Sequence, residues 1–439
     1  MASRDPNPAA KRPVIATSVA GILIIVAHIA ASLALMPVLL NHVGLGGLGL
    51  WLVAMSLFSF THVMSVALCG GVVTALSKAS RRDDQIRISA AATAASTITA
   101  LVLGVTVLPL VGLIDWHAAL SPGTDVSPTD TQRTIWAVAI IVALALPLQL
   151  AKHLLLGLSR GHVGYLAEAA GIVMAAVLVW IGVMTGAPLF VLVTVFGLLP
   201  MLVICVVGGV ALARSGIFVW QPDLAELRRA PWIWRQGGHL GLSQLASSSI
   251  NPADLLIIGL ILGTTYNAAF GAVQQVMLLP TVFVAIISSA FWPRFAQAHA
   301  QGESETLRRS FGKGLLISVS STLIFVVIAG LIMDFILRIW LRQEIDLPPF
   351  IVVGLGAWAV LSSGIGMATT LLRATGHTKL LLVTMVSCAV LKVGLAVLCV
   401  SAIGPGGAPI ATVFAAILCV GLPMALRVPD IWRAHLATP

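Results

Sequence analysis

The chain has 439 residues, of which 59% are hydrophobic and only 9% are charged, whereas about 25% of the residues of an ordinary soluble domain are charged. This composition excludes a soluble globular protein, because it supplies too few polar side chains to cover a surface in water. The formal net charge of +9 would suit a nucleic-acid partner in a soluble protein, but in so apolar a chain its meaning depends on where the charges lie. We therefore expect an integral membrane protein with no nucleic-acid partner.

Apolar runs of about 20 residues, the length that crosses about 30 Å of hydrocarbon, recur from Val14 to Arg427. The expected fold class is an all-α polytopic membrane protein with twelve transmembrane helices. Their predicted ranges are 14–40, 50–77, 87–113, 135–158, 165–184, 188–213, 239–262, 268–292, 314–337, 348–372, 380–402 and 408–426. The first helix follows a short basic lead without a cleavage site, so we expect it to remain as the first span.

Charged residues divide unequally between the two sides of these helices. With the N-terminus in the cytoplasm, twenty-one Lys and Arg residues, among them Lys152 and Arg373, fall on the inner side. Only Arg133, Arg338 and Arg342 fall on the outer side. Because cytoplasmic loops carry an excess of basic residues, the sequence predicts a multi-pass protein with both termini in the cytoplasm.

The long inner loop at 214–238 divides the helices into two sets of six. Its apolar and basic residues alternate in the manner of a helix that lies on the membrane surface. The predicted domains are an N-terminal six-helix lobe at 1–213, this linker, and a C-terminal six-helix lobe at 239–439.

Two pairs of loop signals indicate that the halves are related. The pattern L-x-x-x-x-G-H occurs at 156–162 and again at 371–377, a shift of 215 residues, and Gly44 and Gly263 in the loops after helices 1 and 7 are 219 residues apart. These offsets favour two pseudo-twofold lobes. The alternative is that glycine is simply common in short turns.

A few polar side chains lie inside the predicted spans. Lys392 is too deep in helix 11 for its side chain to reach the interface, and Asp254 in helix 7 follows a stretch too polar to face lipid,. That stretch contains Gln244 and Asn251, and it precedes Pro252, which can break the helix,. The remaining candidates are Glu168 near the inner end of helix 5, His28 in helix 1 and His62 in helix 2.

No nucleophile–base pair, metal-ligand cluster or nucleotide-hydrolysis loop accompanies these residues. We expect no enzymatic activity, no cofactor and no metal site. A transport activity would then draw on an ion gradient, the membrane potential or the gradient of its own substrate.

Five segments in chain order resemble a known family. They lie at the first hairpin (39–51), in helix 7 (252–268), at the inner end of helix 8 (291–307), after helix 9 (337–341) and after helix 10 (372–379). Together they resemble the O-antigen type of polysaccharide flippase in the multidrug/oligosaccharidyl-lipid/polysaccharide exporter superfamily. The helix 7 segment, with Asp254 in Pro-Ala-Asp-Leu-Leu-Ile-Ile-Gly, is the most specific of the five.

The resemblance implies a flippase of the bacterial cytoplasmic (inner) membrane. It would move undecaprenyl-diphosphate-linked oligosaccharide repeat units by alternating access for the synthesis of surface polysaccharides, with its two lobes rocking about a central cavity. The implied partners are the lipid-linked oligosaccharide, H+ or Na+ as coupling ion, membrane lipids, and a polysaccharide polymerase with its chain-length machinery.

Roles for the intramembrane residues follow from this hypothesis. Substrate contact in the cavity is assigned to Lys392, His28, His62, Gln244 and Asn251, and ion coupling to Asp254 and Glu168. A structural alternative stands beside each role. Lys392 and Asp254 could form an ion pair that serves packing, Glu168 could lie in a helix interface, and the histidines could be hydrogen-bonded structural groups.

Two other functions remain open at this point. A drug/cation antiporter of the same superfamily would share the two six-helix lobes, but its cavity would be acidic rather than cationic. A membrane-embedded polysaccharide polymerase or ligase would be expected to carry a large outer loop with several arginines. The longest predicted outer loop, at 114–134, contains only one arginine, Arg133.

Overall fold

The structure is a computed structural model that describes residues 8–79, 81–120, 126–217, 242–342 and 348–427. The chain divides into two compact units. The first contains Met1–Gly47 and Ala54–Gly241, and the second contains Leu48–Val53 and Leu242–Pro439. Most of the linker predicted at 214–238, including its surface helix, lies outside the described residues.

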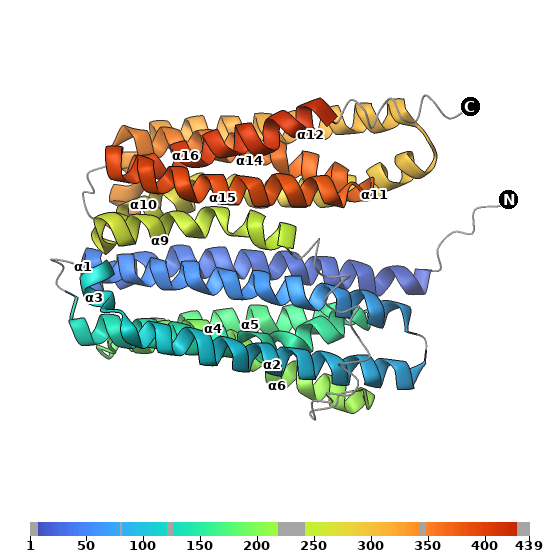
Figure 1. Ribbon diagram of the computed structural model, residues 1–439, viewed down its shortest axis with the longest axis horizontal. Coiled ribbons are helices and arrows are strands. Elements are labelled where there is room, and N and C mark those ends of the chain that lie inside the picture. Colours follow the sequence, from blue (N-terminus) through green and yellow to red (C-terminus); the bar gives the residue numbers. More distant parts are fainter. Residues whose placement is uncertain (1–7, 80, 121–125, 218–241, 343–347, 428–439) are drawn as a thin grey trace. The chain divides into compact units, whose positions relative to one another are not determined.

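The first unit is a bundle of long helices that run close to one direction (Figure 1). Its elements are α1 (Pro8–Lys78) apart from Leu48–Val53, α2 (Arg82–Leu113), α3 (Trp116–Leu120), α4 (Pro128–Gly157), α5 (Gly161–Met184) and α6 (Leu189–Ser215). Helix α4 packs against α2, α5 and α6, and it is therefore the central helix of this unit. Its apolar residues include Leu154 and Leu155, which are fully buried.

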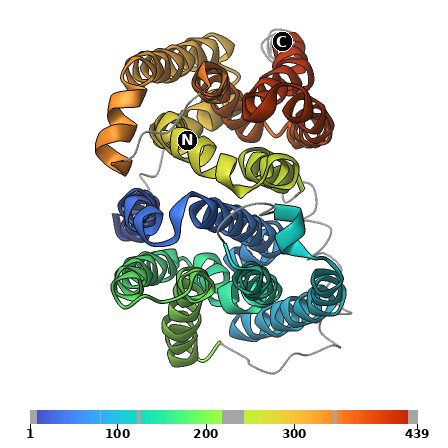
Figure 2. The same cartoon turned by 90° about the vertical axis from the view of Figure 1, so that its left-hand side faces the viewer.

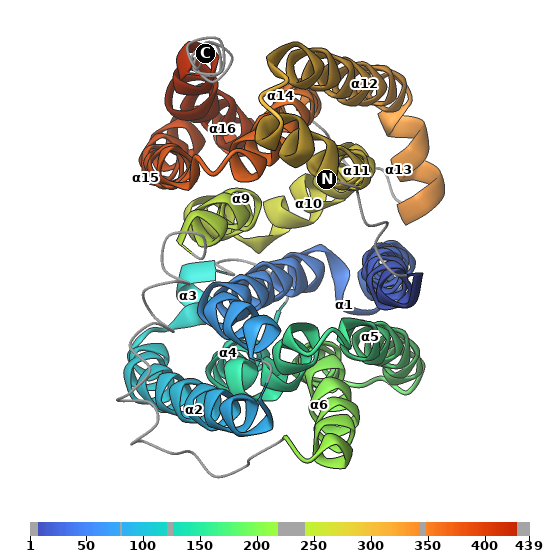
Figure 3. The ribbon, with the colours of Figure 1, turned by 90° about the vertical axis from the view of Figure 1, so that its right-hand side faces the viewer.

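Helix α1 contains two of the predicted spans. The backbone at Gly44 has φ 68° and ψ −176°, which interrupts the helical geometry within the 71-residue element. Figure 3 shows the two parts of α1 as separate helical segments joined at a bend. The predicted helices 14–40 and 50–77 correspond to these two parts.

The second unit contains shorter and more interrupted helices. A helical segment at 242–248 precedes α9 (Ile250–Leu262), and the two are bent by 50° relative to each other. The following elements are α10 (Thr264–Met277), α11 (Leu279–Ala300), α12 (Ser304–Leu331), α13 (Met333–Leu341), α14 (Pro349–Ala374), α15 (Thr378–Ile403), η1 (Gly404–Gly406), α16 (Gly407–Ala416) and η2 (Ile417–Gly421). Figure 2 shows most of these helices end-on. The labels of Figure 3 show α14 among its neighbours α10, α11, α12 and α16.

The described helices confirm an all-α membrane protein. Nine helical stretches are long and apolar enough to cross a bilayer, or ten if the bent pair at 242–262 counts as one span. The stretches Ala16–Thr61 and Thr378–Arg427 each run through a glycine break, at Gly44 and Gly404. The first contains parts of the predicted helices 14–40 and 50–77, and the second contains all of 380–402 and 408–426. Every one of the twelve predicted spans falls on helix within the described ranges.

Candidate functional site

A buried ion pair joins α15 to α9 in the second unit. The Nζ atom of Lys392 lies 2.6 Å from Oδ1 of Asp254. Lys392 is 0% exposed and Asp254 is 1% exposed. The lysine also donates a hydrogen bond of 2.5 Å to the carbonyl oxygen of Ile250.

The break before α9 places Asp254 opposite Lys392. Ser249 separates the segment at 242–248 from α9, and Pro252 lies in the first turn of α9. A proline is tolerated there because the first N–H groups of a helix have no partner inside it. The carbonyl of Ile250, in this same turn, accepts the bond from Lys392, so the lysine satisfies a backbone group and a carboxylate together.

Two other predicted residues of helix 7 bind donors from α14. The indole Nε1 of Trp358 donates to Oδ1 of Asn251 at 2.7 Å. The guanidinium of Arg373 donates to Oε1 of Gln244 at 2.9 Å. The polar side of helix 7 is therefore committed to contacts with other helices of its own unit, and Arg373, expected as a loop charge, belongs to this set.

A second buried ion pair occurs in the first unit. Nζ of Lys152 in α4 lies 3.0 Å from Oε2 of Glu168 in α5, and it donates to Oε1 of Gln149 at 3.2 Å. Gln149 also accepts a hydrogen bond of 3.2 Å from Ser65, whose Oγ lies 3.2 Å from Nε2 of His153. Besides Glu168, this hydrogen-bond network contains two ionisable side chains, Lys152 and His153.

The placement of Lys152 among the inner-loop charges was wrong. The residue lies inside α4 and is 2% exposed. The signal was available, because position 152 falls within the predicted span 135–158. A lysine inside a span requires a carboxylate partner, and Glu168 was the nearest candidate in the chain.

The two predicted histidines differ in what the structure describes. His28 is exposed on α1, and its ring centroid lies 6.2 Å from that of Phe196 in α6. The side chain of His62 lies outside the described residues. His28 lies in the first unit and Lys392 in the second.

The ion pairs are not copies of each other by internal duplication. The residues 215 and 219 positions before Lys392 are Val177 and Val173, and the residue 219 positions before Asp254 is Leu35. The two lysine–carboxylate pairs therefore lie at non-equivalent positions of the two halves of the sequence. Among the described helices, Glu168 and Asp254 are the carboxylates that lie away from helix ends, and each has a lysine within 3.0 Å.

Comparison with known proteins identifies the fold. The MatE family model matches residues 240–398, and no curated protein matches the chain. The inward-facing conformation of a multidrug resistance MATE family transporter of the MOP superfamily aligns with a TM-score of 0.73 and 15% identity, over 96% of this chain and 100% of that one. The lipid II flippase MurJ, in an inward closed conformation, aligns with a TM-score of 0.64 and 13% identity, over 96% and 90%.

A third solved structure has the same fold. It is a MOP superfamily transporter from Pyrococcus furiosus Vc1 (DSM3638), described as having a binding pocket of reverse polarity, with a TM-score of 0.64, 15% identity, and coverage of 98% of this chain and 97% of that one. The chain therefore has the twelve-helix fold of MATE and related MOP superfamily transporters.

Proposed function

We propose that the protein is a transporter that moves an undecaprenyl-diphosphate-linked oligosaccharide repeat unit across the bacterial cytoplasmic membrane by alternating access. The observation that carries the proposal is that Glu168 and Asp254 each have a lysine within 3.0 Å. A diphosphate needs cationic groups on its path through a medium of low dielectric constant. Both units of this chain hold such a group inside the membrane.

The ion pairs also argue against a cationic substrate. Inside a membrane, a positive charge is commonly paired with a carboxylate. Here the amino groups of Lys392 and Lys152 already occupy the two carboxylates, and each pair is formally neutral. Binding a cation would displace a buried lysine and leave it without a counter-charge, which is costly.

The geometry suggests how substrate and ion movement are coupled. Lys392 is fully buried, so the substrate diphosphate reaches it only when α9 and α15 separate during the cycle. Diphosphate and Asp254 then compete for one ammonium group. When the diphosphate binds Lys392, Asp254 loses its counter-charge and takes up H+ or Na+ in its place.

The other predicted site residues have supporting roles in this proposal. Glu168 repeats the same competition at Lys152 in the first unit. Gln244 and Asn251 hold helix 7 against Arg373 and Trp358, and on separation their amides become available to sugar hydroxyl groups. His28, exposed on α1, and His62 are assigned to the cavity.

The second candidate is a drug/cation antiporter. It is favoured by the multidrug MATE transporter that aligns over 96% of this chain, and the lipid II flippase of the same fold favours the first candidate. Identities of 15% and 13% do not choose between these substrates. The charge compensation inside the two units favours the anionic lipid.

The test is a transport assay with the purified protein in proteoliposomes. A fluorescent undecaprenyl-diphosphate oligosaccharide is placed in one leaflet, and its movement is followed by the protection of the sugar from an impermeant reagent. Wild-type protein should move it without lengthening it, Lys392→Ala should not, and Lys379→Ala, an exposed lysine on the same helix, should behave as wild type. Transport of a cationic dye in place of the lipid would overturn the proposal in favour of the antiporter.

A further inference from the structure

Two buried amide side chains of α10 have polar atoms without a hydrogen-bond partner. Asn267 is 0% exposed and Gln274 is 8% exposed. The nitrogen and oxygen of the Asn267 amide, and the Nε2 atom of Gln274, have no partner among the described residues. Buried polar groups are usually hydrogen-bonded, because an unpaired one loses its contact with water without compensation. These amides therefore offer a donor and an acceptor that the described part of the unit does not use.

The amides of helix 7 differ from those of α10 in this respect. Asn251 accepts a hydrogen bond from Trp358, and Gln244 accepts one from Arg373. Both amides of helix 7 thus contribute to the packing of the second unit. The described contacts give no such role to the amide of Asn267.

The segment Leu48–Val53 of α1 covers one side of α10. Four small or polar residues follow one another on this side at intervals of three or four positions, namely Thr264, Asn267, Gly271 and Gln274,. A Cβ atom at Gly271 would lie 2.5 Å from Cδ1 of Leu52. A Cβ atom at Gly49 would clash with the carbonyl oxygen of Thr264. The two segments are therefore in close contact, and both belong to the second unit.

The covering segment is apolar and is joined to the first unit at both ends. Its side chains are all buried, and they are Leu48, Leu50, Trp51, Leu52 and Val53. Apart from the indole of Trp51, these side chains carry no hydrogen-bonding group. Gly47 before the segment and Ala54 after it belong to the first unit. A movement of the first unit relative to the second would therefore draw the segment away from α10 and expose the two amides.

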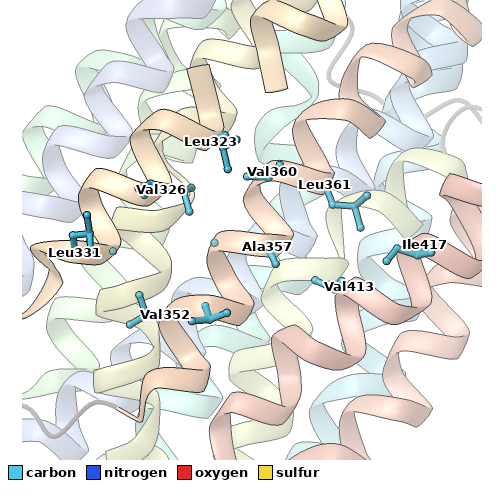
Figure 4. A pocket seen from close by; sticks show the side chains of 13 residues that line it. Leu323, Val326, Leu331, Val352, Ala357, Val360, Leu361, Val413 and Ile417 are labelled. Carbon is cyan, nitrogen blue, oxygen red and sulfur yellow. The ribbon is translucent and has the colours of Figure 1, made fainter. Parts of the chain in front are cut away.

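The apolar groove of the second unit does not offer such groups. It has a volume of about 730 Å³ and lies between α12, α14, α16 and the start of η2 (Figure 4). Every lining residue is Leu, Val, Ile, Ala or Gly. A ligand with hydroxyl groups would lose hydrogen bonds on entering this groove, whereas the amides of α10 could replace them.

We propose that Asn267 and Gln274 form a sugar-binding subsite, which Leu48–Val53 covers in this structure and which opens during the transport cycle. An amide provides both donors and an acceptor, and a sugar hydroxyl group can bind to either. Neither amide is charged, so the subsite suits the oligosaccharide rather than its diphosphate or a cation. The inference rests on the proposed transport of a lipid-linked oligosaccharide, in which Lys392 binds the diphosphate.

The test separates recognition of the sugar from recognition of the diphosphate. Purified protein in proteoliposomes transports the fluorescent undecaprenyl-diphosphate oligosaccharide, and unlabelled undecaprenyl diphosphate is added as a competitor. Asn267→Leu and Gln274→Leu should each raise the half-saturating mole fraction of the glycosylated lipid about three- to tenfold, the loss expected from one neutral hydrogen bond. The inhibition constant of the competitor should keep its wild-type value, because the competitor has no sugar.

The pattern of the two constants distinguishes the subsite from the transport function. A change of both constants, or of neither, would overturn the subsite and leave the transport function standing. A wild-type protein that moves no glycosylated lipid would instead overturn both. Thr265→Val removes a hydroxyl group at an exposed position of the same helix and should leave both constants unchanged.

Thermal unfolding distinguishes the subsite from a structural polar group. Replacing an unpaired buried amide by an apolar side chain of similar size removes a source of instability. Asn267→Leu should therefore raise the midpoint of unfolding of the detergent-purified protein while it weakens sugar binding. A lowered midpoint would show that the amide is hydrogen-bonded in the folded protein, for example to a buried water, and would contradict the proposal.

Discussion

At the residue scale, the strongest constraint is that Lys392 and Asp254 are buried together. Removing one partner leaves an uncompensated charge, which costs about 3–5 kcal/mol, whereas replacing both by apolar residues is often neutral. We predict that Lys392→Met and Asp254→Leu each lower the midpoint of thermal unfolding in detergent strongly, and that the double variant regains most of the loss. The measurement is an unfolding curve of the purified proteins.

The same double variant separates packing from transport. If the pair takes part in the competition for diphosphate, the double variant should be stable but inactive in the proteoliposome assay. A double variant that is stable and transports at the wild-type rate would assign the pair to packing alone. Lys379→Met, an exposed lysine on α15, controls for the loss of a positive charge.

Single residues were predicted in part. The depth of Lys392 follows from its position in an apolar run, and its pairing with Asp254 was one of two alternatives that the sequence left open. The partner itself, 138 positions away, depends on which faces of α9 and α15 meet. Arg373 was missed as a network member because a count of charges by loop says nothing about the direction of a side chain near a helix end. Lys152 was missed although its position within a predicted span indicated a buried partner.

At the scale of the element, glycines mark the positions where helices break. Gly44 and Gly263, paired by the sequence offset, have similar backbones, with φ 68° and ψ −176° at the first and φ 92° and ψ 164° at the second. The other pair differs, because Gly376 has φ 79° whereas Ser159, two positions before Gly161, has the positive φ in its loop. Offset glycines thus predicted one conserved turn geometry and not the other.

Gly44 gives a direct test of this constraint. Its φ and ψ lie in a region that is essentially restricted to glycine, where another residue costs about 1–3 kcal/mol. A Cβ at Gly44 would meet no atom within 4 Å, so the cost would come from the backbone alone. We predict that Gly44→Ala lowers the free energy of unfolding by this amount.

The control for Gly44→Ala lies on the same helix. A Cβ at Gly21 would also meet no atom within 4 Å, and this glycine lacks the positive φ of Gly44. Gly21→Ala should be neutral or stabilising by up to about 1 kcal/mol, since alanine favours the helix over glycine. Equal effects of the two substitutions would show that Gly44 is not under backbone constraint.

At the scale of the whole molecule, composition was sufficient to predict the fold class. Membrane helices must satisfy their own backbone hydrogen bonds, so an apolar chain with regular polar breaks has few alternatives to a helical bundle. The predicted spans fall on helix for this reason. The short helices that interrupt the pattern, such as α13, were not predicted, because their apolar residues merge with the neighbouring span in a hydropathy reading.

The excess of Lys and Arg residues on the predicted inner side implies that both termini lie in the cytoplasm. This orientation can be measured directly. In a variant without the five native cysteines, single cysteines at exposed positions report sidedness through an impermeant thiol reagent. Thr185→Cys and Asp334→Cys should react in intact cells, whereas Arg214→Cys and Lys379→Cys should react only after permeabilisation; all four positions are exposed. Each unit contributes one site of each kind, and one predicted span, 188–213 or 348–372, separates the two sites. If that span did not cross the membrane, both sites of the unit would lie on one side. The reverse pattern in both units would instead invert the protein and place both termini outside the cytoplasm.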